Sequence, residues 1–310
     1  MTRVFIDGSS GTTGLRIRDR LEARPDIELL AIDDSLRKDP SAKADMLKKC
    51  DVAFLCLPDD AARETAALAK GGSAVIIDTS TAHRTEPDWA YGFPELSAEH
   101  EAKIRSSKRI AVPGCHASGF IALVYPLVES GILPKDALLT CHSLTGYSGG
   151  GKKMIAEYEA DGRSVLLGSP RQYGIAQNHK HLKEMKAITG IDTAPMFSPI
   201  VASYYSGMEV TVPLFAAQLN SGFTADDIKK AYVEKYRGNI VKYAPDSDES
   251  GFLAANTLSG KDSMEISVFG NGERILLTAR YDNLGKGASG AAIECMNIVT
   301  GNEKTKGLNI

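Results

Sequence analysis

The stretch RVFIDGSSGTTG (Arg3–Gly14) joins a short apolar run to a turn in which glycine recurs at every third position. We predict that the run is a strand and that a helix follows it, from about Thr13 to Ala23. Glycines at such a turn let backbone N–H groups approach a pyrophosphate at the N-terminus of the helix. The stretch therefore predicts the first unit of a dinucleotide-binding domain.

The turn differs from the most familiar nucleotide-binding pattern, because its spacing is GxxGxxG and not GxGxxG, and a purely structural turn is the alternative. The residues expected to hold the cofactor here are Gly8, Ser10, Gly11, Thr12, Thr13 and Gly14. The second strand ends in AIDDSLRK, where Asp33 or Asp34 would bind a ribose 2′-hydroxyl. Ser35, Arg37 and Lys38 would instead receive a 2′-phosphate, so the residues alone leave NAD and NADP open.

Apolar runs and helical patterns go on alternating beyond this first unit. The runs are IELLAID, DVAFLCLP and AVIIDTS, with helices predicted near 42–49 and 61–70, and RIAVPG (Arg109–Gly114) is a further strand. Such runs, rich in Val, Ile and Leu, are typical of a parallel sheet that helices cover on both faces. We predict an α/β fold that begins with a Rossmann-type, doubly wound parallel sheet.

The pattern changes beyond about Ala137, where longer strand-like stretches such as MEVTVPLFAA and RILLTARYDN alternate apolar and polar residues. They predict an α+β domain with a mixed sheet, one face of which is solvated or forms an interface. The last helical pattern, GKGASGAAIECMNIVTG, could pack back on the first domain. We predict a nucleotide-binding domain, 1–116 completed by 286–310, and a domain for catalysis and oligomerisation, 117–285.

Composition narrows the classes of partner. The 310 residues are 43% hydrophobic and 24% charged, and the formal net charge is -3. This charge gives no long-range attraction to nucleic acid or to an acidic membrane surface, so we expect a small-molecule substrate. No apolar run approaches the ~18 residues of a membrane span, and the start MTRVFIDG has no leader pattern. We expect a cytoplasmic homo-oligomer, a dimer or a tetramer.

Five cysteines are spread along the chain without a CxxC pair, which predicts reduced thiols and no metal site. One of them, Cys115, follows a Pro-Gly turn in VPGCHASGF (Val112–Phe120) and begins a helical run. The N-terminus of a helix stabilises a thiolate, so Cys115 is the candidate nucleophile. The alternative is a buried cysteine that fills the junction between strand and helix.

A thiolate beside a nicotinamide ring suggests chemistry in which a thioester and a hemithioacetal interconvert by hydride transfer. Such chemistry needs a proton carrier, and His179 and His181, two residues apart, would point the same way in an extended segment. His116 adjoins the candidate nucleophile, but we expect it to point away from the sulfur.

Two further segments are candidates for binding an anionic substrate. TGYSGGGKK contains Gly149 and Lys152 and would present N–H groups and a positive charge, although it would serve equally as a hinge. Arg84 lies in DTSTAHR, at the carboxyl end of a predicted strand, where ligands bind in open α/β sheets. A solvated arginine is the alternative there.

The motifs together resemble a known family. GSSGTTG, DTSTAHR, YGFPEL, VPGCHASG, GYSGGGKK, NHKH and DNLGKGASGAA occur, in this order, as in the short form (type 2) of the N-acetyl-gamma-glutamyl-phosphate reductase family. That family belongs to the aspartate-semialdehyde dehydrogenase-like superfamily, and the resemblance covers nearly the whole chain. It implies Cys115 and His179 as the catalytic residues, His181 with the substrate, Asn283 with the cofactor, and NADP as that cofactor.

The resemblance also implies the reaction. NADPH would reduce an acyl phosphate, N-acetyl-gamma-glutamyl phosphate, to the semialdehyde, in arginine biosynthesis, through a thioester on Cys115 and with His179 shuttling the proton. The chain departs from the family pattern at Lys180, where arginine is usual, and at His116, where the long form has tyrosine. The alternatives are an aspartate-semialdehyde dehydrogenase or related acyl-phosphate reductase, and an NADP-sensing protein without turnover.

Overall fold

The computed structural model describes residues 1–310, and the chain divides into two compact units. The first unit comprises Met1–Gly114 and Ala288–Leu308. The second comprises Cys115–Gly287 together with the last two residues, Asn309 and Ile310. The second unit is therefore an insertion in the first, and the chain enters it at Cys115.

The first unit is built on a parallel sheet in the order β2-β1-β3-β4-β6-β5. Its strands are β1 (Thr2–Asp7), β2 (Ile27–Leu30), β3 (Val52–Leu55), β4 (Val75–Asp78), β5 (Ala90–Tyr91) and β6 (Arg109–Ala111). The chain leaves β1 for β2 on one side and returns to β3 on the other. Between β1 and β3 the direction of winding reverses, and in such sheets ligands bind outside the carboxyl ends of the strands at this point.

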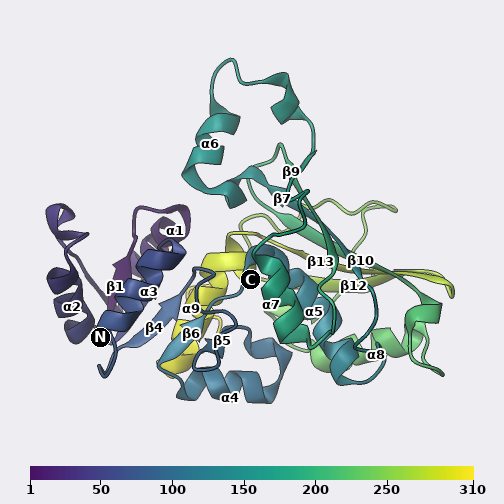
Figure 1. Ribbon diagram of the computed structural model, residues 1–310, viewed down its shortest axis with the longest axis horizontal. Helices are drawn as coiled ribbons and strands as arrows, with labels where there is room; N and C mark the ends of the chain where they lie inside the picture. The colour runs from purple at the N-terminus through teal and green to yellow at the C-terminus, as the bar shows by residue number, and fades with distance from the viewer. The chain divides into compact units, whose positions relative to one another are not determined.

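Helices cover both faces of this sheet (Figure 1). They are α1 (Thr12–Glu22), α2 (Pro40–Lys49), α3 (Asp59–Leu68), α4 (Ala98–Ser106) and α9 (Gly290–Val299). One apolar core joins the sheet to α1, α4 and α9, and a second joins it to α2 and α3. The predicted Rossmann-type, doubly wound domain is confirmed.

The second unit contains a mixed sheet in the order β11-β12-β13-β10-β7-β9-β8. Its strands are β7 (Thr140–Gly146), β8 (Arg171–Gln172), β9 (Met196–Ala202), β10 (Met208–Phe215), β11 (Val241–Tyr243), β12 (Met264–Gly270) and β13 (Arg274–Tyr281). The pairs β7–β9 and β11–β12 are parallel and the others antiparallel, which confirms the predicted mixed sheet.

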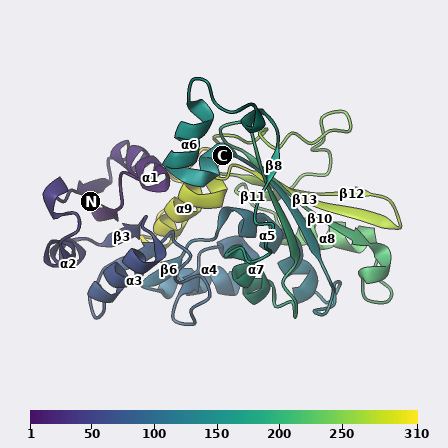
Figure 2. The ribbon, with the colours of Figure 1, turned by 45° about the horizontal axis from the view of Figure 1, so that its top comes forward.

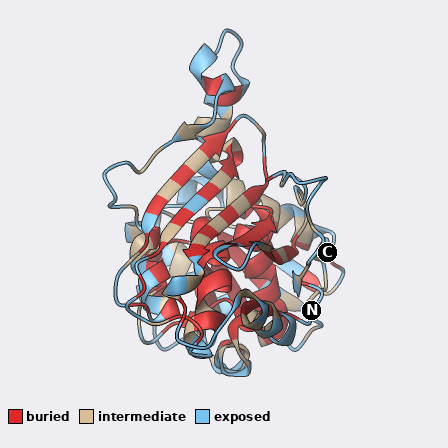
Figure 3. Ribbon diagram, turned by 90° about the vertical axis from the view of Figure 1, so that its right-hand side faces the viewer, coloured by how far each residue is buried: buried red, intermediate tan, exposed pale blue.

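Three helices of the second unit, α5 (Cys115–Glu129), α7 (His181–Thr189) and α8 (Ala225–Lys235), lie on one face of this sheet (Figures 1 and 2). Buried residues alternate with more exposed ones along β10, and Figure 3 shows this alternation on the strands. Helix α6 (Gly151–Glu159) lies in a segment that stands out from the sheet (Figure 1). None of the helices combines the length and the apolarity that crossing a bilayer requires.

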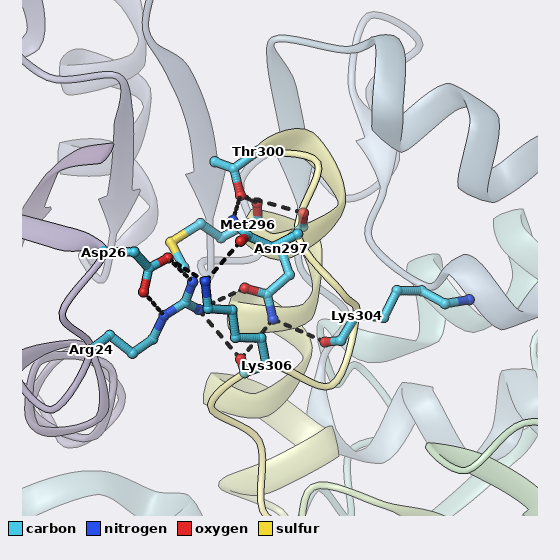
Figure 4. Close-up of polar contacts among 8 residues, drawn as sticks. Arg24, Asp26, Met296, Asn297, Thr300, Lys304 and Lys306 are labelled. Atoms are coloured by element: carbon cyan, nitrogen blue, oxygen red, sulfur yellow. Dashed lines mark hydrogen bonds and ion pairs between the residues drawn. The ribbon is translucent and has the colours of Figure 1, made fainter. Parts of the chain in front are cut away.

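A buried arginine fastens the C-terminal segment within the first unit (Figure 4). The Nη2 of Arg24 donates to Asp26 Oδ2 at 2.7 Å, and its Nη1 donates to Oδ1 of Asn297 in α9 at 2.6 Å. The Nζ of Lys306 donates to the same Asp26 oxygen at 2.8 Å. The hydrogen bond from Arg24 is the main reason why the pKa of Asp26 lies far below its ordinary value.

Replacing this arginine should destabilise the first unit. We expect Arg24→Gln to lower the free energy of unfolding by about 2–3 kcal/mol at pH 7, because Asp26 and Asn297 lose the hydrogen bonds that Arg24 donates. Since the folded-state pKa of Asp26 is lowered, the stability from this pair is present above the unfolded value of about 3.9 and is lost as the pH falls below it. The difference between wild type and variant should therefore shrink below about pH 4.

Urea unfolding at pH 7 and at a pH below about 4 measures this effect. Unfolding can be followed by the fluorescence of Trp89, because the chain has 1 tryptophan and it is buried in the first unit. Arg18→Gln is the matched control on the neighbouring helix. Its pair with Glu22 is exposed, so we expect a loss below about 1 kcal/mol. Equal losses in the two variants would contradict the assignment.

Candidate active site

The glycine-rich turn between β1 and α1 lies against the residue that follows β3. Gly8 has a φ of 87°, and a Cβ on it would lie 2.2 Å from the carbonyl oxygen of Cys56. A Cβ on Gly14 would lie 2.4 Å from the carbonyl oxygen of Gly8. Both positions therefore require glycine, and they place the turn where the winding of the sheet reverses.

The start of α1 fits a phosphate group. No side chain caps this helix and its first turn holds no acidic residue, so its first N–H groups keep their partial positive charge. The Oγ1 of Thr12 is buried and has no hydrogen-bond partner. Gly11 and Thr13 flank this position, and Ser10 is exposed just before it. The turn is suited to the pyrophosphate of a dinucleotide.

A carboxylate that would oppose an anion at this turn is neutralised. Asp7, the last residue of β1, is buried, and its Oδ2 lies 2.8 Å from the Nζ of Lys43. The hydroxyl of Thr65 donates to the same oxygen at 3.0 Å. These partners come from α2 and α3, and nothing in the sequence pattern predicted them.

The side chains expected near the ribose lie on or next to a short 3₁₀ turn, Asp34–Leu36, and are solvent-exposed. Asp33 accepts hydrogen bonds from the backbone N–H and the hydroxyl of Ser35, which lower its pKa. Arg37 forms an exposed ion pair with Asp34, with 2.5 Å between Nη2 and Oδ1. Such exposed pairs are weak, so Arg37 can exchange its partner for a phosphate.

Arg84, the residue expected to bind an anionic group, is buried in the first unit. Its Nε donates to the carbonyl oxygen of Val112 at 2.8 Å, and its Nη2 donates to that of Thr79 at 3.1 Å. The guanidinium thus joins the loop after β4 to the segment after β6, which leads to Cys115. The alternative, a solvent-exposed arginine at this position, is therefore wrong.

Cys115 is the first residue of α5 and is partly buried. The first turn of α5 contains no acidic residue, so the positive end of the helix dipole acts on the sulfur without competition from a carboxylate. A Cβ on Gly287 would lie 3.1 Å from the Cβ of Cys115, so glycine at this position leaves room for the side chain of Cys115.

The hydroxyl of Tyr281 forms hydrogen bonds with two backbone groups in the first turn of α5. It donates to the carbonyl oxygen of Cys115 at 2.5 Å and accepts from the N–H of Gly119 at 3.0 Å. These two backbone groups are an i, i+4 pair of the helix. A Cβ on Gly119 would lie 2.6 Å from Val210 Cγ2 and 2.7 Å from the Tyr281 oxygen, so α5 is pressed against the sheet at this point.

His116, the next residue, lies in a buried cluster of rings. Its Nδ1 is 2.6 Å from the hydroxyl of Ser143, and its Nε2 is 2.6 Å from the hydroxyl of Tyr173. Burial is the main cause that lowers the pKa of His116 to about 3, and the charge of His179 adds to it. The ring centroids of His116 and His179 are 6.0 Å apart. The sequence pattern alone did not suggest this cluster.

The two histidines of NHKH lie together at the start of α7. Their ring centroids are 4.7 Å apart, and the backbone N–H of His181 donates to the Nδ1 of His179 at 3.2 Å. His179 is partly exposed and His181 is buried. The ring of Tyr173 lies 6.0 Å from that of His179. Burial is the main cause that raises the pKa of Tyr173, and the electrostatic effect of Cys115 adds to it.

The glycine-rich loop TGYSGGGKK is pinned by Asn283. Its Oδ1 accepts from the N–H of Gly207 at 2.9 Å, and its Nδ2 donates to the hydroxyl of Ser148 at 3.1 Å. A Cβ on Gly149 would lie 3.4 Å from this Nδ2. Lys152 is exposed in the first turn of α6. The structure thus joins Gly149 and Asn283, whereas Arg84 and the first glycine-rich turn belong to the other unit.

Solved structures with a similar fold are semialdehyde dehydrogenases. Aspartate semialdehyde dehydrogenase II from Vibrio cholerae has a TM-score of 0.72 at 17% identity, and the match covers 97% of this chain and 98% of that chain. Aspartate semialdehyde dehydrogenase with NADP from Candida albicans has a TM-score of 0.69 at 16% identity, with 97% and 98% covered. At such identities the likeness shows the fold alone.

Comparisons of sequence identify the family of the chain. The model of the semialdehyde dehydrogenase NAD binding domain matches residues 33–104, and that of the semialdehyde dehydrogenase dimerisation domain matches residues 115–283. The N-acetyl-gamma-glutamyl-phosphate reductase of Rhizobium meliloti is 45% identical over 304 residues, which cover 96% of this chain and 98% of the relative. That of Brucella ovis is 43% identical over 307 residues, with 96% and 99% covered. The resemblance inferred from the motifs is confirmed, and the chain belongs to the N-acetyl-gamma-glutamyl-phosphate reductase family.

Proposed function

We propose that this chain catalyses the NADPH-dependent reduction of N-acetyl-gamma-glutamyl phosphate to N-acetylglutamate 5-semialdehyde and phosphate, in arginine biosynthesis. The observation that supports this most directly is the position of Cys115, at the start of α5, where the first turn has no acidic residue, and directly before His116 of the histidine cluster. The choice of substrate comes from the relatives that match over nearly their full length, which are named N-acetyl-gamma-glutamyl-phosphate reductase.

The first step in this proposal is a nucleophilic attack by the sulfur of Cys115. The thiolate of Cys115 attacks the acyl carbon, the bond from that carbon to the phosphate oxygen breaks, and phosphate leaves with the electron pair. The product is a thioester on Cys115. We propose that Arg84, His181, Gly149 and Lys152 contribute to binding the anionic substrate, since charge and N–H donors suit its phosphate and carboxylate.

The cofactor is held by the first unit in this proposal. Gly8 to Gly14 would receive the pyrophosphate, and Ser35 and Arg37 would receive the 2′-phosphate. We also propose Asn283 as a cofactor-binding residue. When bound, NADPH supplies the hydride that reduces the thioester carbon.

His179 is the proposed proton carrier. In the structure its Nδ1 accepts from the N–H of His181, which favours the tautomer with a proton on Nε2. A ring that carries protons on both nitrogens must give up this contact, and at 3.2 Å the contact is weak enough to be lost at little cost. Nε2 is therefore the atom that would meet the oxygen of the substrate carbonyl.

Intact-protein mass spectrometry tests this function. When the acyl phosphate is supplied without NADPH, we expect an acyl adduct that maps to Cys115 and is absent from Cys115→Ala. Adding NADPH should then discharge the adduct and release the semialdehyde. An adduct on another residue, or turnover without any adduct, would contradict the proposal.

The same assay separates the substrates. We expect N-acetyl-gamma-glutamyl phosphate to form the adduct, whereas the unacetylated aspartyl phosphate carries an ammonium group that requires its own partner. A preference for the aspartyl compound would indicate an aspartate-semialdehyde dehydrogenase. Binding of NADPH with no thiol-dependent turnover of either compound would indicate a nucleotide sensor.

We further propose that the chain works as a homo-oligomer, a dimer or a tetramer, in the cytoplasm. The support is the family model that matches residues 115–283, because it describes a dimerisation domain. A purely monomeric mass in light scattering would contradict the proposed assembly.

A further inference from the structure

His116 stands directly after the proposed nucleophile on α5 and is 3% exposed. Both of its ring nitrogens are engaged, Nδ1 with the hydroxyl of Ser143 on β7 and Nε2 with the hydroxyl of Tyr173, each at 2.6 Å. These partners come from two different segments of the second unit. A buried ring held at both nitrogens has one orientation, and so does a hydroxyl bonded to it.

We infer that His116 is a positioning residue for the reaction, which holds the hydroxyl of Tyr173 beside Cys115 and His179. The inference rests on the proposed function, because that function assigns the nucleophile and the proton carrier to those two residues. His116 itself does not touch the substrate in this role. It acts through Tyr173.

The protonation of the ring supports this role. Burial lowers the pKa of His116 to about 3, so the ring is neutral at any ordinary working pH and carries one N–H. It must donate at one nitrogen and accept at the other. In one tautomer Ser143 accepts and Tyr173 donates to the ring; in the other Ser143 donates and Tyr173 accepts. In the second tautomer the hydroxyl proton of Tyr173 is free to point to the reacting groups.

The surroundings keep this arrangement fixed. The centroid of the His116 ring lies 5.4 Å from that of Phe197, 5.7 Å from that of His181 and 6.0 Å from that of His179. Desolvation is the main cause that raises the pKa of Tyr173, and the charge of Cys115 adds to it, so its hydroxyl keeps its proton. Tyr173 therefore keeps a hydroxyl proton that it can donate.

A double-mutant cycle tests the coupling between the two residues. We expect His116→Phe and Tyr173→Phe each to lower kcat by about 10²-fold, the cost of a misplaced catalytic group. The KM for the acyl phosphate should stay within roughly threefold, because no substrate contact is removed. The double variant should be no slower than either single variant, since both break the same hydrogen bond. Effects that multiply, or a kcat near that of wild type in His116→Phe, would overturn the inference.

Two controls separate positioning from folding. His142→Gln changes an exposed histidine on the same strand as Ser143 and should leave kcat unchanged. His116→Gln can still donate and accept, so it should recover part of the kcat that His116→Phe loses. Melting temperatures show whether each variant is folded, and a folded His116→Gln no faster than His116→Phe would count against the hydrogen bond.

A measurement on the free protein does not depend on the substrate. In ¹⁵N spectra of histidine-labelled protein, we expect His116 to remain neutral between about pH 5 and 8. Tyr173→Phe should change its ¹⁵N shifts, because Nε2 loses its partner. Titration of His116 in this range, or unchanged shifts in Tyr173→Phe, would overturn the inference. A wild type that turns over no acyl phosphate would refute the proposed function, and the spectra would still decide the hydrogen bond.

Discussion

Cys115→Ser should reduce turnover by about 10⁴-fold or more, because a hydroxyl at this position is a far weaker nucleophile than a thiolate and removing a nucleophile commonly costs this much. The affinity for NADPH should not change, since no residue of the glycine-rich turn is altered. Steady-state rates and a fluorescence titration with NADPH measure the two quantities. A nucleotide sensor would show no difference in turnover between variant and wild type.

The other cysteines supply the control for this result. Burial raises the pKa of Cys50 to about 11 and that of Cys56 to about 12, and it raises the pKa of Cys141 further. These thiols therefore stay protonated at neutral pH and should not react with iodoacetamide. We expect Cys50→Ala to keep wild-type turnover and to be inactivated at the wild-type rate. Alkylation spread evenly over several cysteines would contradict a selectively activated Cys115.

His179→Asn should lower kcat by 10²-fold to 10⁴-fold, about the contribution of a positioned acid or base. Asparagine keeps a side chain of similar polarity but cannot pass a proton. The pH profile of kcat should also lose the limb that belongs to the imidazole. Rates measured across pH for wild type and variant test both expectations, and a kcat within threefold of wild type would rule out this residue as the proton carrier.

His181→Asn separates the roles of the neighbouring rings. The ring of His181 lies 4.7 Å from that of His179, but His181 is buried whereas His179 is partly exposed. If His181 binds the substrate, its replacement should mainly raise KM, with kcat changed by less than about 10-fold. The opposite pattern, a large loss of kcat in His181→Asn and a small one in His179→Asn, would exchange the two assignments.

The fold was predictable from local patterns because each β-α unit of the first domain carries its own signal. The glycine-rich turn, the apolar runs and the helical patterns between them need no knowledge of distant contacts. Strand β9 is different and was not among the predicted strands. It contains Pro199, which cannot donate to a ladder and usually argues against a strand, and its partner β7 lies more than fifty residues earlier in the chain.

The candidate site was predictable where a local sequence pattern marks a residue, as for Cys115 after its Pro-Gly turn and for the two histidines of NHKH. Cys115 was predicted from its turn and helix, and that helix begins at this residue. Ser143, Tyr281 and the position of His116 were not predicted. Each belongs to a strand or helix pattern in which a polar residue has no special spacing, and only the packing of α5 on β7 and β13 brings them to the start of the helix.

The chain leaves the nucleotide-binding unit at Gly114 and resumes it at Ala288, so one uninterrupted segment carries Cys115, the cluster of His116, His179 and His181, and the tyrosine that His116 holds. A recombination event with breakpoints at those two junctions would transfer the proposed nucleophile and proton carrier in a single piece, while the glycine-rich turn and the residues expected near the ribose would stay those of the recipient. The proposed catalytic residues and the glycine-rich turn can thus be inherited separately, and the junction between the two segments lies at the peptide bond that precedes Cys115.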